Sequence, residues 1–245
     1  SKNALKGAGF FVGAALLQWI GFRGALALLA GLLLVVLIIT ALLLPSGVGR
    51  MKSKPKFTQV FSNRPAINWL AAARFFLFGS RDVWFVVGLP VFLYSVLGWS
   101  FTQVGGFMAL WIIGYGIVQA SAPRLIRRSH HGRGPGGGTA RLWAFILALF
   151  PAAIALGLHY EFSPVLVLVT GLVLFGVVFA INSAVHSYLS RAYSDFDKVS
   201  KKVGFHYMAN AGGRLAGTVL SGWVYQTQGL TGCLWWSTAF VLAAA

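Results

Sequence analysis

Four charged residues lie inside long apolar stretches, which separates them from the other charges of the chain. Arg74, Arg81 and Asp82 fall in one stretch and Arg214 falls in another. A guanidinium is always ionised, and its N–H groups match pairs of oxygens on phosphate, arsenate or carboxylate. Three guanidiniums against one carboxylate indicate an excess of positive charge, so we expect the three arginines to bind a small anion.

Helical spacing relates these side chains to one another. Arg74 and Arg81 are seven residues apart, which puts them on nearly one face of a helix, two turns apart. Asp82 is rotated from Arg81 by about 100°. We therefore expect Asp82 to pair with a group on another helix, foremost Arg214, rather than with its neighbour. Both a structural ion pair and a proton carrier fit this placement. Asn210 lies one turn before Arg214, where it is placed to orient Arg214 and to share in binding.

Two histidines within apolar stretches, His186 and His206, titrate near neutral pH and suit either a proton relay or hydrogen bonds between helices. Amide side chains inside these stretches are expected to hydrogen-bond between helices. They are Asn68, Gln103, Gln119, Asn182 and Asn210. No metal site or cofactor is expected, and the single cysteine excludes an internal disulfide.

The elements that hold these residues are long apolar segments. The chain is 58% hydrophobic and 10% charged, which indicates an all-α membrane protein. Each segment is long enough to cross ~30 Å of hydrocarbon at ~1.5 Å per residue. We expect a kink at Pro90 in the third. The eight predicted spans are residues 4–20, 24–44, 66–95, 101–123, 141–158, 163–189, 203–226 and 230 to the end.

Basic residues occupy every second gap between these spans. Sixteen of the twenty Lys and Arg residues fall at the start of the chain and in the gaps at 45–65, 124–141 and 190–202. Short loops rich in Lys and Arg stay in the cytoplasm, so the pattern predicts cytoplasmic loops at these positions of a multi-pass inner (plasma) membrane protein. Because apolar spans separate the basic residues, the charge does not indicate nucleic-acid binding.

A repeated pattern of small residues relates the two ends of the chain. Gly9 and Gly13 precede a Gly-x-x-Gly at 21–24, and Gly213 and Gly217 precede another at 229–232. Both copies enter from the predicted cytoplasmic side, as in the parallel halves of major facilitator superfamily transporters. In that arrangement residues 1–45 hold helices five and six of twelve, 46–65 form the central cytoplasmic loop, and 66–245 hold helices seven to twelve. The first four helices would precede this sequence, and the last helix would be truncated.

The segment 76–93, which includes Arg81-Asp-Val-Trp84, resembles the organoarsenical efflux permeases of that superfamily, as do 114–123 and 22–26. The resemblance extends over essentially the whole chain. It implies export of an arseno-phosphoglycerate that a partner glyceraldehyde-phosphate dehydrogenase makes from arsenate, and hence arsenate resistance. It implies no particular binding residue, so the candidate site depends on the charge argument alone.

Other functions differ in what they require of the sequence. A major facilitator transporter for another small organic anion would need the same arginines, whereas one for a cationic drug would need acids in the cavity. A membrane-embedded transferase is disfavoured because the chain has no phosphate-binding loop and no His-Glu-x-x-His helix. A passive channel would need a repeated pore motif, which is also lacking. We therefore expect a secondary-active transporter rather than an enzyme.

Overall fold

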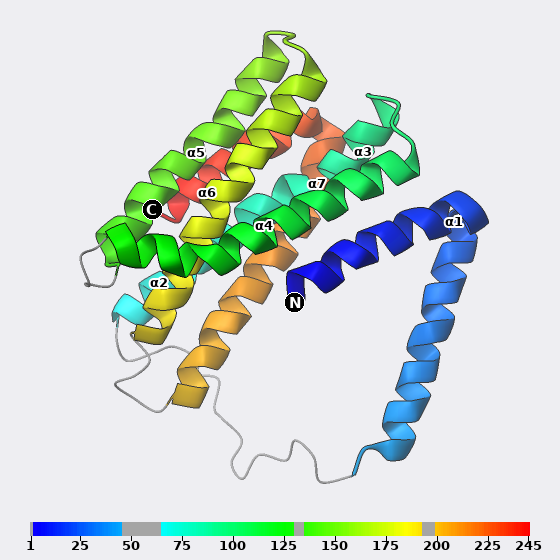
Figure 1. Ribbon diagram of the computed structural model, residues 1–245, viewed down its shortest axis with the longest axis horizontal. Helices are drawn as coiled ribbons and strands as arrows, with labels where there is room; N and C mark the ends of the chain where they lie inside the picture. Colours follow the sequence, from blue (N-terminus) through cyan, green and yellow to red (C-terminus); the bar gives the residue numbers. More distant parts are fainter. Residues whose placement is uncertain (1, 46–64, 130–134, 193–198) are drawn as a thin grey trace.

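The computed structural model describes residues 2–45, 65–129, 135–192 and 199–245, with the side chains of 2–4, 123–129 and 199–206 outside the described part. These residues form helices and contain no strand, which confirms the all-α prediction (Figure 1). The helices are α1 (Lys2–Leu43), α2 (Pro65–Phe85), α3 (Gly88–Ser95), α4 (Phe101–Ser129), α5 (Gly137–His159), α6 (Pro164–Ala192) and α7 (Val199–Ala243).

Within the described ranges, five helical segments are long and apolar enough to cross a membrane. They are Leu5–Leu43, Pro65–Ser95, Phe101–Ala122, Gly137–His159 and Pro164–Ala192. The protein is therefore a multi-pass helical membrane protein. The count of eight spans stays a prediction. It depends on the two bent helices α1 and α7, which the sequence divides into two spans each.

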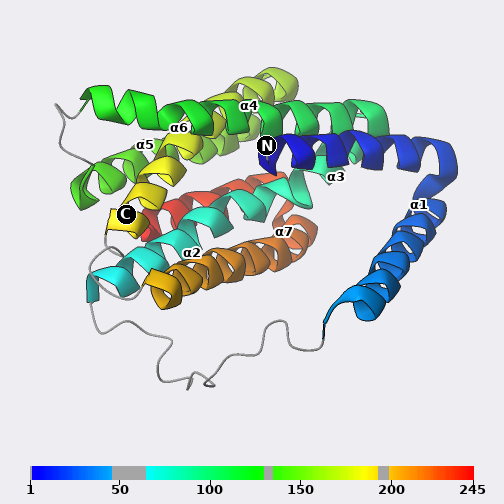
Figure 2. The same ribbon diagram turned by 60° about the horizontal axis from the view of Figure 1, so that its bottom comes forward.

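Both bent helices turn at a glycine that begins a predicted Gly-x-x-Gly motif. Gly21 in α1 has φ 68° and ψ 177°, and Gly229 in α7 has φ 67° and ψ −166°. A positive φ is accessible to glycine because it has no Cβ. The two copies of the predicted repeat thus share one backbone conformation. After the turn, α7 folds back along the bundle, whereas the second half of α1 extends away from it (Figure 2).

The glycine pairs before these turns pack differently. A Cβ at Gly217 would lie 2.5 Å from the carbonyl oxygen of Gly79 on α2, so α7 and α2 are in close contact there. Gly9 and Gly13 have no atom within 4 Å of the corresponding position. The first half of α1 instead packs on α4, where Gly105 faces Ala14. The two copies are therefore alike in their turns and unlike in their packing.

The predicted kink near Pro90 is present as a break between α2 and α3. Proline has no N–H, so Pro90 cannot donate to the carbonyl oxygen of Val86 one turn earlier. The hydroxyl of Ser221 on α7 accepts hydrogen bonds from the N–H groups of Val87 at 3.2 Å and Gly88 at 3.1 Å. A neighbouring helix thus satisfies the broken turn, as is usual inside a membrane.

Among α2 and α4 to α7, the helix ends next to the basic stretches lie together. The starts of α2, α5 and α7 and the ends of α4 and α6 are at one end of the bundle, and the α5–α6 turn and the bend of α7 are at the other (Figure 1). This arrangement agrees with the alternation of charge along the chain. The loops 46–64, 130–134 and 193–198 lie outside the described residues, and the side of the membrane that each end faces stays a prediction.

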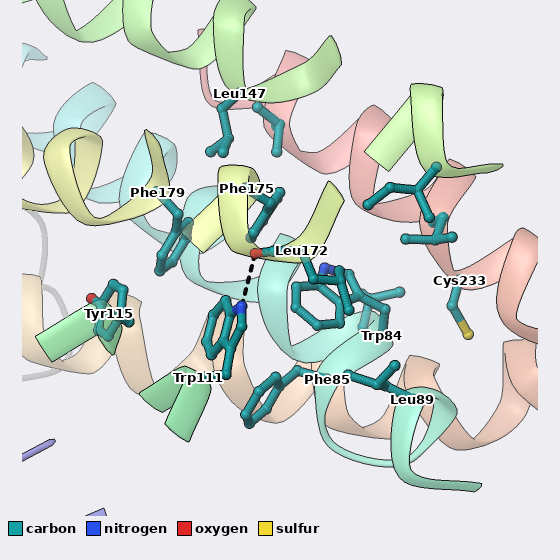
Figure 3. Close-up of a cluster of buried hydrophobic side chains, with 14 of the residues drawn as sticks. Trp84, Phe85, Leu89, Trp111, Tyr115, Leu147, Leu172, Phe175, Phe179 and Cys233 are labelled. Atoms are coloured by element: carbon teal, nitrogen blue, oxygen red, sulfur yellow. Dashed lines mark hydrogen bonds between the residues drawn. The ribbon is translucent and has the colours of Figure 1, made fainter. Parts of the chain in front are cut away.

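Aromatic side chains fill the space between α2, α4 and α6 (Figure 3). Trp84 meets Trp111 and Phe175 edge to face, with ring centroids 5.7 Å and 5.3 Å apart. The indole nitrogen of Trp111 donates a hydrogen bond to the carbonyl oxygen of Leu172 at 2.7 Å. Edge-to-face pairs add to the stability gained from burial, so this cluster is a rigid support for the charged residues beside it.

Candidate functional site

Asp82 on α2 is fully buried, and both of its carboxylate oxygens accept hydrogen bonds from arginines. Oδ1 accepts from Nε of Arg81 at 2.7 Å and also from its Nη2, and Oδ2 accepts from Nε of Arg214 at 2.7 Å. We call Asp82, Arg81 and Arg214 the Asp82 triad. The expected pairing of Asp82 with Arg214 is confirmed. The expectation that Asp82 would not pair with Arg81 is wrong, because the long arginine side chain folds back onto the adjacent residue.

The triad forms where glycines let α7 approach α2. A Cβ at Gly217 would lie 3.1 Å from the Cβ of Asp82, and a Cβ at Gly79 would lie 2.9 Å from the carbonyl oxygen of Gly213. Arg214 follows Gly213 directly. Small residues at a helix contact allow the backbones to approach closely, and this approach brings the guanidinium of Arg214 within reach of Asp82.

Arg81 is enclosed by the aromatic cluster. Its guanidinium carbon lies 5.7 Å from the ring centre of Phe85 and 5.6 Å from that of Phe179. Both distances are within the range of cation–π attraction, and only 6% of the residue is exposed. Arg81 is therefore held by a carboxylate and two rings at once.

Arg74 faces the same side of α2 two turns earlier, as its spacing predicts. Its Nη1 donates to the hydroxyl of Ser190 on α6 at 3.3 Å, and its guanidinium lies 5.2 Å from the ring centre of Phe78. Only 7% of Arg74 is exposed, and its buried Nε has no hydrogen-bond partner. No carboxylate among the described residues pairs with it.

The charges of these four residues do not cancel. Arg81 and Arg214 share the carboxylate of Asp82, and Arg74 has no carboxylate partner, which leaves an excess of two positive charges in the described part of this site. An arginine at mid-bilayer costs roughly 2.5 to 3.5 kcal/mol on insertion scales, so such an excess is expensive to keep in an apolar bundle. A bound anion would reduce this cost.

A layer of uncharged polar groups on α4 and α6 lies beside the arginines. The amide nitrogen of Gln119 donates to the hydroxyl of Ser183 at 3.0 Å, and Tyr115 donates to the same hydroxyl at 3.5 Å. Gln119 thus joins two helices, as predicted. His186 is buried one turn after Ser183 on the same helix. Asn182 is also fully buried, but neither of its amide atoms has a hydrogen-bond partner, so the interhelical bond expected of it is absent.

Two further expectations for polar residues are wrong. Asn210 does not orient Arg214, since its buried Oδ1 has no hydrogen-bond partner and Asp82 holds Arg214 instead. Gln103 does not join helices. Its side chain accepts a hydrogen bond from the N–H of Ser100, whose hydroxyl accepts from the N–H of Gln103, a capping box that starts α4.

One predicted site residue cannot be placed. His206 belongs to α7, but its side chain is outside the described part. Sequence reasoning did not single out Tyr115, Ser183 or Ser190 as members of the site. The sequence could have indicated the two serines on α6. Ser183 lies three residues before His186 and Ser190 four residues after it, so both share its helix face.

The site lies next to a contact between α1 and α2. The ring of Phe10 on α1 meets Phe85 edge to face, with centroids 5.9 Å apart, and Phe85 in turn covers Arg81.

Comparisons with protein families, with curated proteins and with solved structures found no match. The charges and contacts of this site, together with the resemblance of the sequence, are therefore what supports a function.

Proposed function

We propose that the protein is a secondary-active transporter that exports a small organic anion across the inner membrane. We further propose that this anion is an organoarsenical, an arseno-phosphoglycerate, so that export confers arsenate resistance. The observation that carries the proposal is the charge imbalance of the site, where Asp82 pairs with Arg81 and Arg214 and no described carboxylate pairs with Arg74. A protein that only needed an ion pair to hold two helices would not need the second and third guanidinium.

The chemistry of the proposed substrate suits these side chains. A phosphate and an arsenate ester each present several negatively charged oxygens, and a guanidinium fork binds two such oxygens at once. The excess of positive charge supports an anion as the substrate class. The resemblance to organoarsenical efflux permeases supports the arsenic compound within that class.

The arrangement of the helices supports a transport mechanism. In secondary transporters built from repeats, the substrate binds near the bilayer midplane at the junction of the repeats, and rocking of one repeat against the other exposes the site alternately to each side. The proposed assignment makes α1 helices five and six of a major facilitator protein and α2 to α7 helices seven to twelve. The matching turns at Gly21 and Gly229 and the contact of Phe10 with Phe85 beside Arg81 support this assignment.

A major facilitator transporter for a different small organic anion is the second candidate, since the same charge imbalance favours it. A cationic drug is a poor fit, because the only carboxylate described at the site already accepts hydrogen bonds from two arginines.

Arsenate survival of a sensitive bacterial strain tests the proposal. Expression of the full chain together with an arsenate-using glyceraldehyde-phosphate dehydrogenase should raise the arsenate concentration that the strain tolerates, and neither protein alone should do so. Equal survival with and without this protein would contradict the proposal. Export of an unrelated anion would leave arsenate survival unchanged and appear instead as uptake of that anion by everted vesicles.

A transport assay gives the direct measurement. Everted membrane vesicles expose the cytoplasmic face, so vesicles supplied with the dehydrogenase, its substrates and arsenate should accumulate arsenic. Omission of glyceraldehyde phosphate is the matched control, because arsenate is then present without the ester. Equal accumulation in both conditions would indicate transport of arsenate itself and contradict the organoarsenical assignment.

A further inference from the structure

The two arginines of the Asp82 triad differ in how much of each guanidinium is already in use. Arg81 donates from Nε and Nη2 to the carboxylate, lies between the rings of Phe85 and Phe179, and is 6% exposed. Arg214 donates from Nε alone, and 44% of its side chain is exposed. No other described residue accepts a hydrogen bond from the Arg214 side chain.

We propose that Arg214 is the guanidinium that docks the transported anion, and that Asp82 is a positioning residue that orients it. The inference rests on the proposed function in taking the ligand to be an oxyanion. The two arginines of the triad then have different roles, because Arg81 keeps Asp82 in place and does not touch the substrate.

The geometry of the guanidinium supports this division. A guanidinium is planar and rigid, so the hydrogen bond from Nε to Oδ2 of Asp82 at 2.7 Å restrains the whole plane of Arg214. The edge formed by Nη1 and Nη2 remains available, and it offers the two parallel N–H donors that bind a phosphate, arsenate or carboxylate bidentately. Arg81 already gives two of its five N–H donors to Asp82, and Phe85 and Phe179 cover its guanidinium, so its remaining donors are less accessible to a second oxyanion.

The exposure of Arg214 and the charge balance of the triad also support docking at Arg214. A transporter must bind and release its substrate in every cycle, and a half-exposed side chain can exchange partners without breaking the packing around it. Release from Arg81 would require the rings of Phe85 and Phe179 to move. Asp82 neutralises only one of the two guanidiniums of the triad, so the anion that docks at Arg214 completes the charge balance.

Isothermal titration calorimetry of the purified full chain in detergent tests the inference, with 3-phosphoglycerate, inorganic phosphate and arsenate as probes. We expect Arg214→Gln to weaken the tightest of these interactions by roughly 10- to 100-fold, the range for charged hydrogen bonds. Arg214→Lys keeps the charge but not the fork, and we expect a smaller loss. Arg191→Gln is the matched control, because Arg191 is an exposed arginine whose Nε donates to the backbone oxygen of Ser187 on its own helix. It should bind as the wild type does.

The positioning role of Asp82 has a separate signature. Asp82→Glu keeps the negative charge but moves the carboxylate by one methylene, so it should weaken binding several-fold in the wild-type background. In the Arg214→Lys background there is no fork to orient, and Asp82→Glu should change affinity by less than about twofold. An equal loss in both backgrounds would show that Asp82 acts on folding rather than through Arg214, and would overturn this role.

The docking role is overturned if the wild type binds none of the three anions or if Arg214→Gln binds them unchanged. Failure of the proposed function gives a different result. Anion binding that depends on Arg214, with no arsenic accumulation in the vesicle assay, would support docking at Arg214 and contradict only the organoarsenical substrate.

Discussion

At the scale of single residues, the two arginines on one face of α2 have opposite electrostatic surroundings. Arg81 has a carboxylate at hydrogen-bond distance, whereas the partners of Arg74 among the described residues are the hydroxyl of Ser190 and the ring of Phe78. A buried charge without a counter-charge does not stabilise a fold. The presence of Arg74 is therefore better explained by binding than by structure.

We therefore predict that removal of Arg74 and removal of the Asp82 carboxylate have different effects on stability. Arg74→Met replaces a buried guanidinium by an apolar side chain of similar length, so the free energy of unfolding should be unchanged or higher while anion transport falls at least tenfold. Arg74→Lys, which keeps a cation, should retain part of the transport. Thermal unfolding in detergent and arsenic uptake by everted vesicles measure the two properties. Unchanged transport by Arg74→Met would contradict a binding role.

Asp82→Asn is the matched comparison at the same helix. It leaves Arg81 and Arg214 without their shared carboxylate, and breaking a buried ion pair in this way costs about 3 to 5 kcal/mol. The melting temperature should therefore fall clearly, in contrast to Arg74→Met. A melting temperature equal to that of the wild type would show that the triad does not hold α2 and α7 together.

At the scale of elements, the contact between α2 and α7 depends on the absence of side chains. Gly213 and Gly217 face Phe75 and Gly79, and the Asp82 triad is formed beside this contact. The position of the charged site is thus set by a packing feature of two helices. A change of backbone separation there must also change the geometry of the ion pair.

Gly217→Ala should disturb both features at once. The added Cβ would lie 2.5 Å from the carbonyl oxygen of Gly79, which forces the helices apart and should lower the free energy of unfolding by about 1 to 3 kcal/mol. Gly222→Ala on the same helix is the control. It meets no atom within 4 Å and should be neutral or stabilising by up to about 1 kcal/mol, since alanine favours helix. Thermal unfolding distinguishes the two, and equal melting temperatures would contradict the close contact.

At the scale of the whole molecule, the charge alternation and the direction of the helices agree. The ends of α2 and α4 to α7 that adjoin the basic stretches lie at one end of the bundle, and the α5–α6 turn lies at the other (Figure 1). The positive-inside rule predicts that the basic end faces the cytoplasm.

Labelling of single cysteines tests this orientation. In a Cys233→Ser background, Lys54→Cys should react with a membrane-impermeant thiol reagent in everted vesicles and not in intact cells. Ser163→Cys, next to the exposed α5–α6 turn, should show the opposite pattern. The wild-type protein is a suitable control, because Cys233 is buried and should react in neither preparation. Labelling of both positions from the same side would contradict the predicted topology.

Pairing within the site was only partly predictable from sequence. Spacing predicts the common face of Arg74 and Arg81 and the link from Asp82 to Arg214, because helical periodicity determines which side of a helix a residue is on. It does not predict that Arg81 folds back onto Asp82, that Oδ1 of Asn210 has no hydrogen-bond partner, or that Gln103 caps its own helix. These outcomes depend on rotamers and on local competition for hydrogen bonds, which residue spacing does not contain.

The sequence by itself determines that this is a multi-pass helical protein, which residues turn its bent helices, and that positive charge exceeds negative charge inside its apolar stretches. These properties follow from composition and periodicity, which act locally along the chain. The tertiary structure alone decides that one carboxylate serves two arginines, that Arg81 is enclosed by Phe85 and Phe179, and that Arg214 keeps a free edge. Contacts between helices distant in sequence decide this, since the same charges could have been shared differently had α7 approached α2 at another height.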